Sequence, residues 1–441
     1  MAKKKLIYTF ANKPPYILGF CLLNAILLIS PIYLAGQDLS YARAVVDTLS
    51  APSMHGRAYV REGDRLAARY ISREFKHWGL ELLGLDYYQP FRVNAMVYPS
   101  CMDVTLGKRY LLPGIDYQVT PGSGGIEGKY KIRRVGERDL LQSKRYDRLM
   151  QQNFQGQVVQ LCYRQQYADS LRNRLSDFKQ RAKAAAYIVP AFDKLTWHIS
   201  TKPLYYSEIQ LKSTHFAQRN TNIQLKIDAE YLQNYETRNV IGYISGAVEP
   251  DSFVVFTAHY DHLGRMGSDV YIPGANDNAS GIAMLLNLAK HYSQHKPHYT
   301  VLFIAFSGEE LGLLGSKHYV HNAPFDLKKI KFLVNTDIVG TGNEGITVVN
   351  ATEFPHQFQD LQQINQTQQY LPLVKQRGKA ANSDHHWFYE RQVPCFFIYT
   401  MGGIKAYHDI YDRAGTLPLS HFVPLCRLLI DFAAGLAPRD E

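Results

Sequence analysis

The sequence contains few cysteines, and they stand far apart. Only five occur in 441 residues. None of them has the close spacing of a zinc knuckle or a redox pair, which excludes small cysteine-based metal sites and thioredoxin-like chemistry. Cys101 and Cys162 could pair in an oxidising compartment, and the sequence leaves that open. No disulfide scaffold is implied.

Internal repeats and low-complexity tracts are also lacking. With 46% apolar and 20% charged residues, the composition is that of a globular protein, which excludes pervasive disorder. The formal net charge of +10 would suit a nucleic-acid partner. However, the basic residues are scattered, and the densest clusters, MAKKK at the start and KYKIRR at 129–134, lie in no nucleic-acid-binding motif. We therefore predict no nucleic-acid partner.

A long hydrophobic run stands near the start of the chain. It follows the basic MAKKK and has no charge between Lys13 and Asp38. A basic start, an apolar stretch and small residues at its end are typical of a secretory signal, while about twenty apolar residues could also span a bilayer. We predict that residues 1–36 are a signal peptide or a membrane anchor. The rest would then be exported, to the periplasm or the extracellular space, with membrane contact only through this segment.

After residue 36, the pattern of apolar and polar residues changes twice along the chain. Residues 37–95 contain a stretch with helical spacing of apolar residues, GDRLAARYISREFKHWGLE, and form the N-terminal part of the main domain. Residues 96–238 alternate short β-rich runs with polar, turn-rich segments, and we interpret them as a β-rich inserted domain. From 239 to 441, strands and helices alternate. We expect this last part to be the core of the main domain.

The runs from 239 onward predict the fold class. Apolar strands such as SFVVFTAH, TVLFIAF and KIKFLVN alternate with helical segments such as NASGIAMLLNLAKHYSQ and EELGLLGSKHYVHN. Apolar strands without polar alternation are buried on both faces. We therefore predict an α/β fold with a mostly parallel central sheet and helices on both faces.

Residues able to bind metal follow these strands. The strand ends and adjacent loops contain His259, Asp277, Glu309 and Glu310, Asp337, and His408. Ligands bind beyond the carboxyl ends of the strands in such sheets, so these side chains should converge. That many carboxylates could not all remain ionised together without cations, and mixed imidazole and carboxylate donors suit zinc.

The motifs that contain these residues resemble those of a known family. AHYDHLG, PGANDNASG, FSGEELGLLGS, NTDIVG, SDHHWF and YHDIYD are similar, in order and spacing, to the motifs of the M28 family of zinc aminopeptidases. The likeness covers roughly 239–420 and continues more weakly through MHGRAYVREGDRLAARYISREFKHWGLE. It implies a zinc aminopeptidase-like fold and two Zn²⁺ ions per chain, bridged by an aspartate and a water.

The resemblance also assigns ligands. Asp277 would be the bridging carboxylate, followed by a cis peptide bond to Asn278. His259 and Asp337 would complete one zinc site, and Glu310 and His408 the other.

Three further residues receive catalytic or supporting roles. Neighbouring Glu309 and Glu310 cannot comfortably bind one ion, and the family assigns the first as the general base that activates the metal-bridged water. Asp261 stands two residues after His259, so it can accept from the imidazole or shape its pocket. Tyr407 is a candidate oxyanion donor, although a packed tyrosine is an equal interpretation. Asp384 could cap a helix or support a ligand, and we favour support.

The resulting hypothesis is an exported dizinc metallopeptidase that removes N-terminal residues from peptides. Three alternatives stay open. A carboxypeptidase of the same superfamily would need a cationic clamp for the substrate carboxylate. A glutaminyl-peptide cyclotransferase would use one zinc, which His259 and GANDNASG argue against. A non-enzymatic, receptor-like relative would have lost ligands. The insert at 96–238 loosely resembles a protease-associated domain and would act as a lid that restricts access to short peptides.

Overall fold

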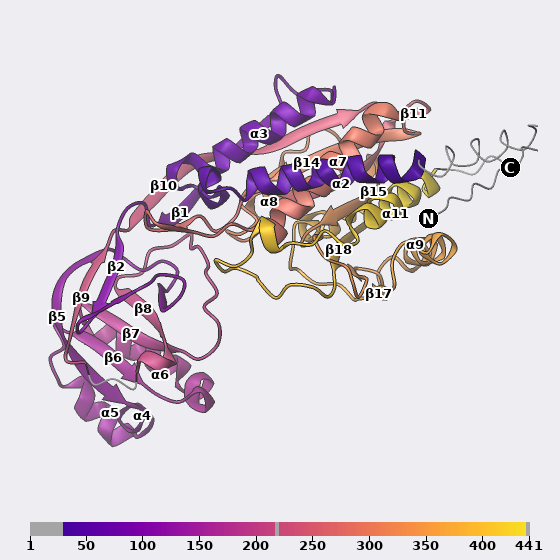
Figure 1. The fold of residues 1–441 in the computed structure, drawn as a ribbon. Coiled ribbons are helices and arrows are strands. Elements are labelled where there is room, and N and C mark those ends of the chain that lie inside the picture. Colours follow the sequence, from indigo (N-terminus) through magenta and orange to yellow (C-terminus); the bar gives the residue numbers. More distant parts are fainter. Residues whose placement is uncertain (1–29, 217–219, 438–441) are drawn as a thin grey trace, which may run out of the picture.

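The computed structural model describes residues 30–216 and 220–437, which form two lobes (Figure 1). Residues 1–29 of the predicted signal or anchor lie outside the described residues. Within the described ranges, no helix combines the length and the apolar character that crossing a membrane requires. Export and anchoring therefore stay predictions.

The larger lobe is built on an eight-stranded sheet. In spatial order its strands are β1 (Tyr88–Val97), β10 (Glu230–Ile244), β14 (Tyr299–Phe306), β11 (Glu249–His259), β15 (Ile330–Thr336), β18 (Cys395–Thr400), β16 (Ile346–Val349) and β17 (Val374–Gln376). The four strands from β14 to β18 are parallel, while β1, β10 and β16 pair antiparallel with their neighbours on the central side. The predicted α/β class with a mostly parallel central sheet is confirmed.

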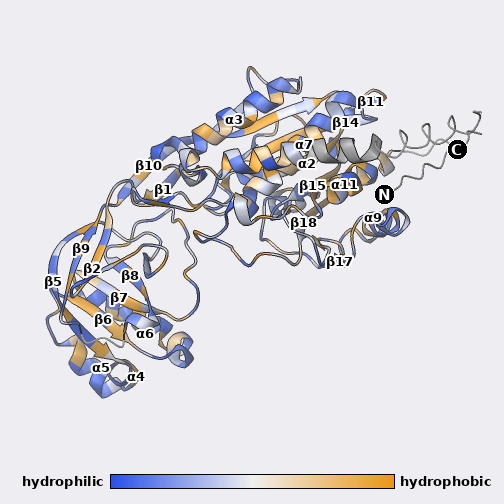
Figure 2. Cartoon of the chain, in the orientation of Figure 1, coloured by the Kyte–Doolittle hydropathy of each residue, from blue (hydrophilic) through white to orange (hydrophobic). Residues whose placement is uncertain are grey.

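Both faces of this sheet are buried, as the apolar runs predicted. Along β14, Val301, Phe303 and Ala305 face one hydrophobic cluster, while Leu302 and Ile304 face another. Successive side chains of a strand point to opposite faces, so a strand buried on both sides needs apolar residues at every position. Figure 2 shows hydrophobic colours along the central strands and α7.

Helices cover the two faces unequally. The larger cluster lies under α2 (Ser30–Leu49), α3 (Gly63–His77), α7 (Ser280–Gln294), α9 (Pro355–Gln368) and α11 (Phe422–Gly435). The opposite face packs against α8 (Leu314–His321) and α10 (His385–Tyr389), which contribute Tyr319 and Phe388. A small hairpin, β12 (Arg265–Met266) with β13 (Val270–Tyr271), follows β11.

The smaller lobe contains a second eight-stranded sheet. Its order is β3 (Arg109–Leu111), β2 (Met102–Leu106), β9 (Asn222–Ile227), β5 (Ile126–Gly136), β6 (Val158–Cys162), β7 (Ala186–Ala191), β8 (Ser207–Lys212) and β4 (Tyr117–Val119). Three helices accompany it: α4 (Glu137–Leu141), α5 (Ser143–Met150) and α6 (Ala168–Ala182). These helices were not foreseen from the sequence, where the segment was interpreted as β-rich. We call the part from 96 to 238 the insert, and its bounds as a domain stay a prediction.

The predicted helix at EELGLLGSKHYVHN is wrong in its first turn. Helix α8 begins only at Leu314, and Glu309 and Glu310 lie in a turn before it. Gly308 and Gly312 have φ values of +73° and +99°, which an α-helix does not permit. The two glutamates are therefore placed by a turn and not by helical spacing.

The disulfide left open by the sequence does not form in the structure. Cys101 and Cys162 are both free thiols, and so is the buried Cys395.

Candidate metal centre

The predicted metal ligands meet at one edge of the core sheet. His259 is the last residue of β11, and Asp337 directly follows β15. Glu309 and Glu310 stand in the turn after β14, and His408 lies in the loop after β18. Asp277 occupies a short π-helical turn, Ala275–Ala279, that leads into α7. The parallel strands bring these segments together because their carboxyl ends point to the same edge.

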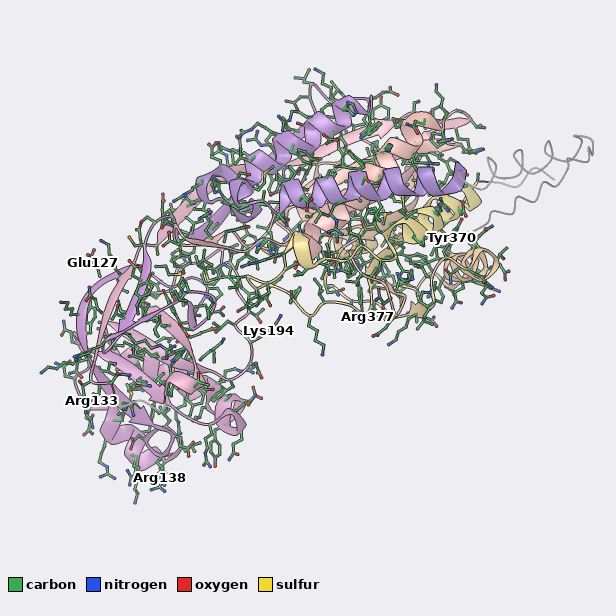
Figure 3. The ribbon with its side chains drawn as sticks, viewed as in Figure 1. Glu127, Arg133, Arg138, Lys194, Tyr370 and Arg377 are labelled. Carbon is green, nitrogen blue, oxygen red and sulfur yellow. The ribbon has the colours of Figure 1, made fainter. Side chains whose placement is uncertain are left out.

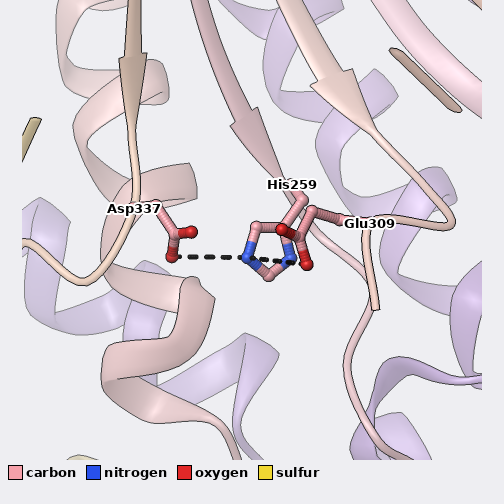
Figure 4. A group of neighbouring side chains, drawn as sticks. All are labelled: His259, Glu309 and Asp337. Atoms are coloured by element: carbon pink, nitrogen blue, oxygen red, sulfur yellow. Dashed lines mark hydrogen bonds and ion pairs between the residues drawn. The ribbon is translucent and has the colours of Figure 1, made fainter. Parts of the chain in front are cut away.

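A first group of donor atoms surrounds His259. Its Nε2 atom lies 3.4 Å from Asp277 Oδ1, 3.3 Å from Asp337 Oδ1 and 4.0 Å from Glu309 Oε2. Figure 4 shows the imidazole between Asp337 and Glu309. The His259 ring is 1% exposed, so the group is shielded from solvent.

A second group forms on the other side of Asp277. His408 Nε2 lies 3.0 Å from Asp277 Oδ2 and 3.3 Å from Glu310 Oε2. His262 Nδ1 lies 2.7 Å from Glu310 Oε1. Asp277 thus contacts both groups, since Oδ1 lies 3.4 Å from His259 Nε2 and 3.9 Å from His262 Nδ1 while Oδ2 faces His408, and its carboxylate can bridge them.

The charge balance of this cluster fits divalent cations. Burial, followed by repulsion from Glu310 and Asp337, raises the pKa of Glu309 well above its ordinary value. Burial likewise raises the pKa of Asp261 and of Asp384 to about 7. Crowded buried carboxylates are costly when ionised, and cations among them remove that cost. Imidazole and carboxylate donors with spacings of 3–4 Å fit zinc.

Asp261 supports the site, but not in the way the sequence suggested. The Nδ1 atom of His259 lies 3.1 Å from the backbone carbonyl oxygen of Asp261 and 3.8 Å from its carboxylate Oδ1, so the carbonyl is the hydrogen-bond partner of the ring. The fully buried carboxylate accepts instead from the backbone N–H groups of Glu309, at 3.1 Å, and Glu310, at 3.3 Å. Asp261 therefore fixes the turn that bears both glutamates.

A chain of hydrogen bonds orients Asp337. Thr257 Oγ1 donates to Asn335 Oδ1 at 2.7 Å, and Asn335 Nδ2 donates to Ser383 Oγ at 2.8 Å. Ser383 Oγ then donates to Asp337 Oδ2 at 3.1 Å, which leaves Oδ1 facing His259. Such outer partners fix the direction of a ligand.

The loop that bears Asp277 is held from two sides. Arg57 is fully buried, and its guanidinium donates to five backbone carbonyl oxygens, those of Leu49, Tyr260, Pro273, Gly274 and Asp277. The buried carboxylate of Asp412 accepts from the backbone N–H groups of Asn276 and Asp277. The peptide bond between Asp277 and Asn278 is cis, as the family resemblance implied.

Two predicted residues have surroundings that refine their roles. The Tyr407 ring stacks on the His408 ring at 3.9 Å between centroids and is 43% exposed, so it lies beside the second group. Its part as an oxyanion donor stays a prediction. Asp384 makes no side-chain cap to α10 and instead accepts from Ser316 Oγ at 2.5 Å. The capping interpretation is therefore wrong for Asp384.

Several residues of the site received no role from the sequence, among them His262, Arg57 and His198. His262 had a local signal, because it stands three residues after His259 in the quoted motif AHYDHLG. Arg57 lies in the quoted stretch MHGRAYVREGD, which gave it no role, and His198 had no local signal, since its partner His408 lies 210 residues away along the chain. His198 belongs to the insert, and its Nδ1 atom lies 3.3 Å from Nδ1 of His408.

Comparison with known proteins supports the family resemblance. A sequence profile of peptidase family M28 matches residues 239–431. Aminopeptidase YwaD of Bacillus subtilis is 37% identical over 129 residues, which are 29% of this chain and 26% of that protein. A probable zinc metalloprotease of Pyricularia oryzae is 35% identical over 111 residues, 24% of this chain and 22% of the relative. The matched part thus spans about a quarter of the length of these relatives.

Solved structures extend the likeness of fold to both lobes. The zinc aminopeptidase BSAP from Bacillus subtilis has a TM-score of 0.66 at 20% identity and covers 90% of this chain and 93% of its own. A peptidase M28 precursor from Shewanella amazonensis has a TM-score of 0.64 at 16% identity and covers 93% of this chain and 97% of its own. The profile match spans His259, Asp277, Glu309, Glu310, Asp337 and His408, the residues that the strand ends bring together. Residues 239–431 of this chain therefore belong to peptidase family M28.

Proposed function

We propose that this protein is an exported dizinc aminopeptidase that removes N-terminal residues from peptides. The observation that carries the proposal is the position of Asp277 between the two donor groups. Its Oδ1 atom faces His259 at 3.4 Å, and its Oδ2 atom faces His408 at 3.0 Å. One carboxylate shared between two imidazole-containing groups suits a pair of metal ions better than one.

The residues of the chain divide between holding metal and moving protons. His259 and Asp337 would hold one zinc ion, Glu310 and His408 the other, and Asp277 both. When bound, such ions acidify water and polarise the scissile carbonyl. Glu309 lies beside the first group, with Oε2 4.0 Å from His259 Nε2, and its pKa is raised by burial. Its carboxylate takes the proton of the attacking water and then gives it to the leaving amine.

A carboxypeptidase would need a cationic group to bind the substrate carboxylate. Arg57, a buried cation next to the site, donates to five backbone carbonyls and is not free to bind a substrate carboxylate. This arrangement supports an aminopeptidase over a carboxypeptidase.

Export is proposed from the sequence pattern of residues 1–36. The basic start and the uncharged run that follows support a signal peptide or an anchor. Short peptides outside the cytoplasm would then be the substrates. The insert, placed beside the loop of His408 by its contacts, would restrict access to the site.

The test joins metal analysis to a substrate screen. We expect purified protein to contain two zinc ions per chain and to hydrolyse aminoacyl p-nitroanilides and free peptides, but not peptides with an acetylated amino terminus. Residues released from the carboxyl end of acetylated peptides would indicate a carboxypeptidase. Release of pyroglutamate from glutamine-leading peptides, with one zinc per chain, would indicate a cyclotransferase.

A further inference from the structure

We propose that the segment Lys194–His198 of the insert is a structural part of the second donor group, with His198 as the positioning residue for His408. The proposal rests on the dizinc function above. It assigns the insert a part in binding metal, beyond that of a lid.

His408 has a backbone conformation that its own loop does not favour. Its φ is +51°, in the left-handed region that residues with a Cβ atom rarely adopt. Such a conformation persists only when the surroundings fix it. The side chain must nevertheless be directed accurately, because Nε2 faces Asp277 Oδ2 at 3.0 Å and Glu310 Oε2 at 3.3 Å.

The insert supplies contacts that fix this loop. The backbone N–H of Trp197 donates to the carbonyl oxygen of His408 at 2.8 Å. Lys194 Nζ donates to the carbonyl oxygens of Lys405, at 3.1 Å, and Tyr407, at 2.9 Å, and lies 3.0 Å from Asp409 Oδ2. Figure 3 shows Lys194 on the long loop that runs from the smaller lobe toward the larger one.

The segment is itself anchored, so it can transmit this restraint. Trp197 is 1% exposed, and its Nε1–H donates to the carbonyl oxygen of Leu263 at 3.0 Å. Its ring packs edge-on against Tyr98. Gln118 Nε2, from β4 of the insert, donates to the carbonyl oxygen of Thr196 at 2.9 Å. The segment therefore joins the insert sheet, the chain after β11 and the His408 loop.

His198 contacts the ligand side chain itself. Its Nδ1 atom lies 3.3 Å from Nδ1 of His408, and the two rings meet at 69° with centroids 4.9 Å apart. A histidine that binds metal through Nε2 carries its proton on Nδ1, and a hydrogen-bond acceptor there fixes the ring and the tautomer. His198 can be that acceptor, and it belongs to the insert.

The two donor groups should therefore differ in their dependence on the insert. His259 and Asp337 of the first group are oriented by Asp261, Ser383 and other residues of the larger lobe. His408 of the second group is oriented by Trp197 and His198. Damage to the segment should weaken one zinc site and spare the other.

The experiment measures zinc affinity on the full metal-free chain. Zinc ions are titrated in competition with a chromophoric chelator, which resolves the two affinities without reference to activity. We expect His198→Ala to weaken one affinity by about 10–100-fold, the usual effect of losing an outer partner of a metal ligand, and to leave the other unchanged. Lys194→Met should weaken the same site.

Matched variants distinguish a role of His198 in positioning His408 from a general loss of folding. His198→Asn places an amide oxygen near the position of Nδ1 and should restore most of the affinity. His356→Ala, an exposed histidine of α9, and Lys131→Met, an exposed lysine of β5, should bind zinc as the wild type does. Each variant should keep the wild-type circular dichroism spectrum.

Two results would overturn the proposal. The first is wild-type affinity at both zinc sites in His198→Ala, and the second is an equal loss of affinity in His198→Asn and His198→Ala. A wild-type chain that binds fewer than two zinc ions would contradict the proposed function and the inference together. Two zinc ions with unaltered affinities in His198→Ala would contradict the inference alone.

Discussion

At the scale of single residues, the turn that bears Glu309 and Glu310 directs their adjacent side chains into different donor groups. Glu309 lies beside His259 in the first donor group, while Glu310 faces His408 and His262 in the second. Asp261 fixes both by accepting from their backbone N–H groups. Adjacent positions can thus serve different chemistry because their side chains leave one rigid turn in different directions.

The assignment of Glu309 as a base predicts a separation of activity from metal content. Glu309→Gln keeps the shape of the side chain but cannot take a proton, so kcat should fall by roughly 10²–10⁴-fold, the usual contribution of general acid–base catalysis. Zinc content, measured by atomic emission, should stay at the wild-type value. Glu310→Gln is the matched control, and it should lose zinc from the second group. A Glu309→Gln protein without zinc would refute the division of roles.

Arg57 predicts a large effect on stability from a residue outside the donor set. Removing its guanidinium leaves five carbonyl oxygens without their donor and nearby buried carboxylates, such as that of Asp412, without its positive charge. Arg57→Met should therefore lower the free energy of unfolding by about 3–5 kcal/mol. Urea unfolding of the metal-free protein measures this. Arg69→Met, at an exposed arginine of α3, should change it by less than about 0.5 kcal/mol. Equal effects of the two substitutions would show that Arg57 does not hold the loop.

At the scale of elements, the strands were predictable and the turns were not. The continuous apolar runs at 299–306 and 330–336 indicated buried parallel strands, and the sheet confirms them. The helix start was predicted too early because Glu309 and Glu310 are favourable first-turn residues. The positive φ values of Gly308 and Gly312 instead delay the start of α8 to Leu314. Sequence patterns report burial along an element more reliably than backbone geometry between elements.

The start of α8 gives a prediction for the turn that bears the glutamates. A Cβ atom at Gly315 would lie 2.0 Å from the carbonyl oxygen of Ser307 and 2.5 Å from Asn239 Oδ1. Gly315→Ala should therefore displace α8 from the turn and lower stability by about 1–3 kcal/mol. Gly435→Ala, at the end of α11 where a Cβ meets nothing within 4 Å, is the matched control and should be neutral or slightly stabilising. Thermal unfolding compares them, and equal melting temperatures would contradict the close packing.

At the scale of the whole molecule, the site depends on contacts that no local pattern contains. The proposed ligands His259, Asp277, Glu310, Asp337 and His408 could be named from the sequence because each stands at a strand end or in a recognisable motif. Arg57 and His198 were not, because Arg57 holds Tyr260, 203 residues away, and the loop of Asp277, while His198 contacts His408, 210 residues away. Local sequence indicates which residues can bind metal, whereas the assembled fold determines which others hold them in place.

Removal of metal should therefore lower the stability of the whole protein. An ion that binds only the folded state stabilises it, by about 2.7 kcal/mol when its concentration is 100 times its dissociation constant. A chelator should abolish hydrolysis and lower the melting temperature, and added zinc should restore both. Scanning calorimetry with a parallel peptide assay tests this. A hydrolase that resists chelation at an unchanged melting temperature would contradict a metal-dependent site.

A pair of zinc ions that share Asp277 would be visible by anomalous X-ray diffraction at the zinc edge. We expect two peaks about 3.5–4 Å apart, as in known two-metal sites. One should lie among His259, Asp277 and Asp337, and the other among Asp277, Glu310 and His408. A single peak in zinc-saturated crystals, or a second peak away from Asp277, would contradict a shared aspartate.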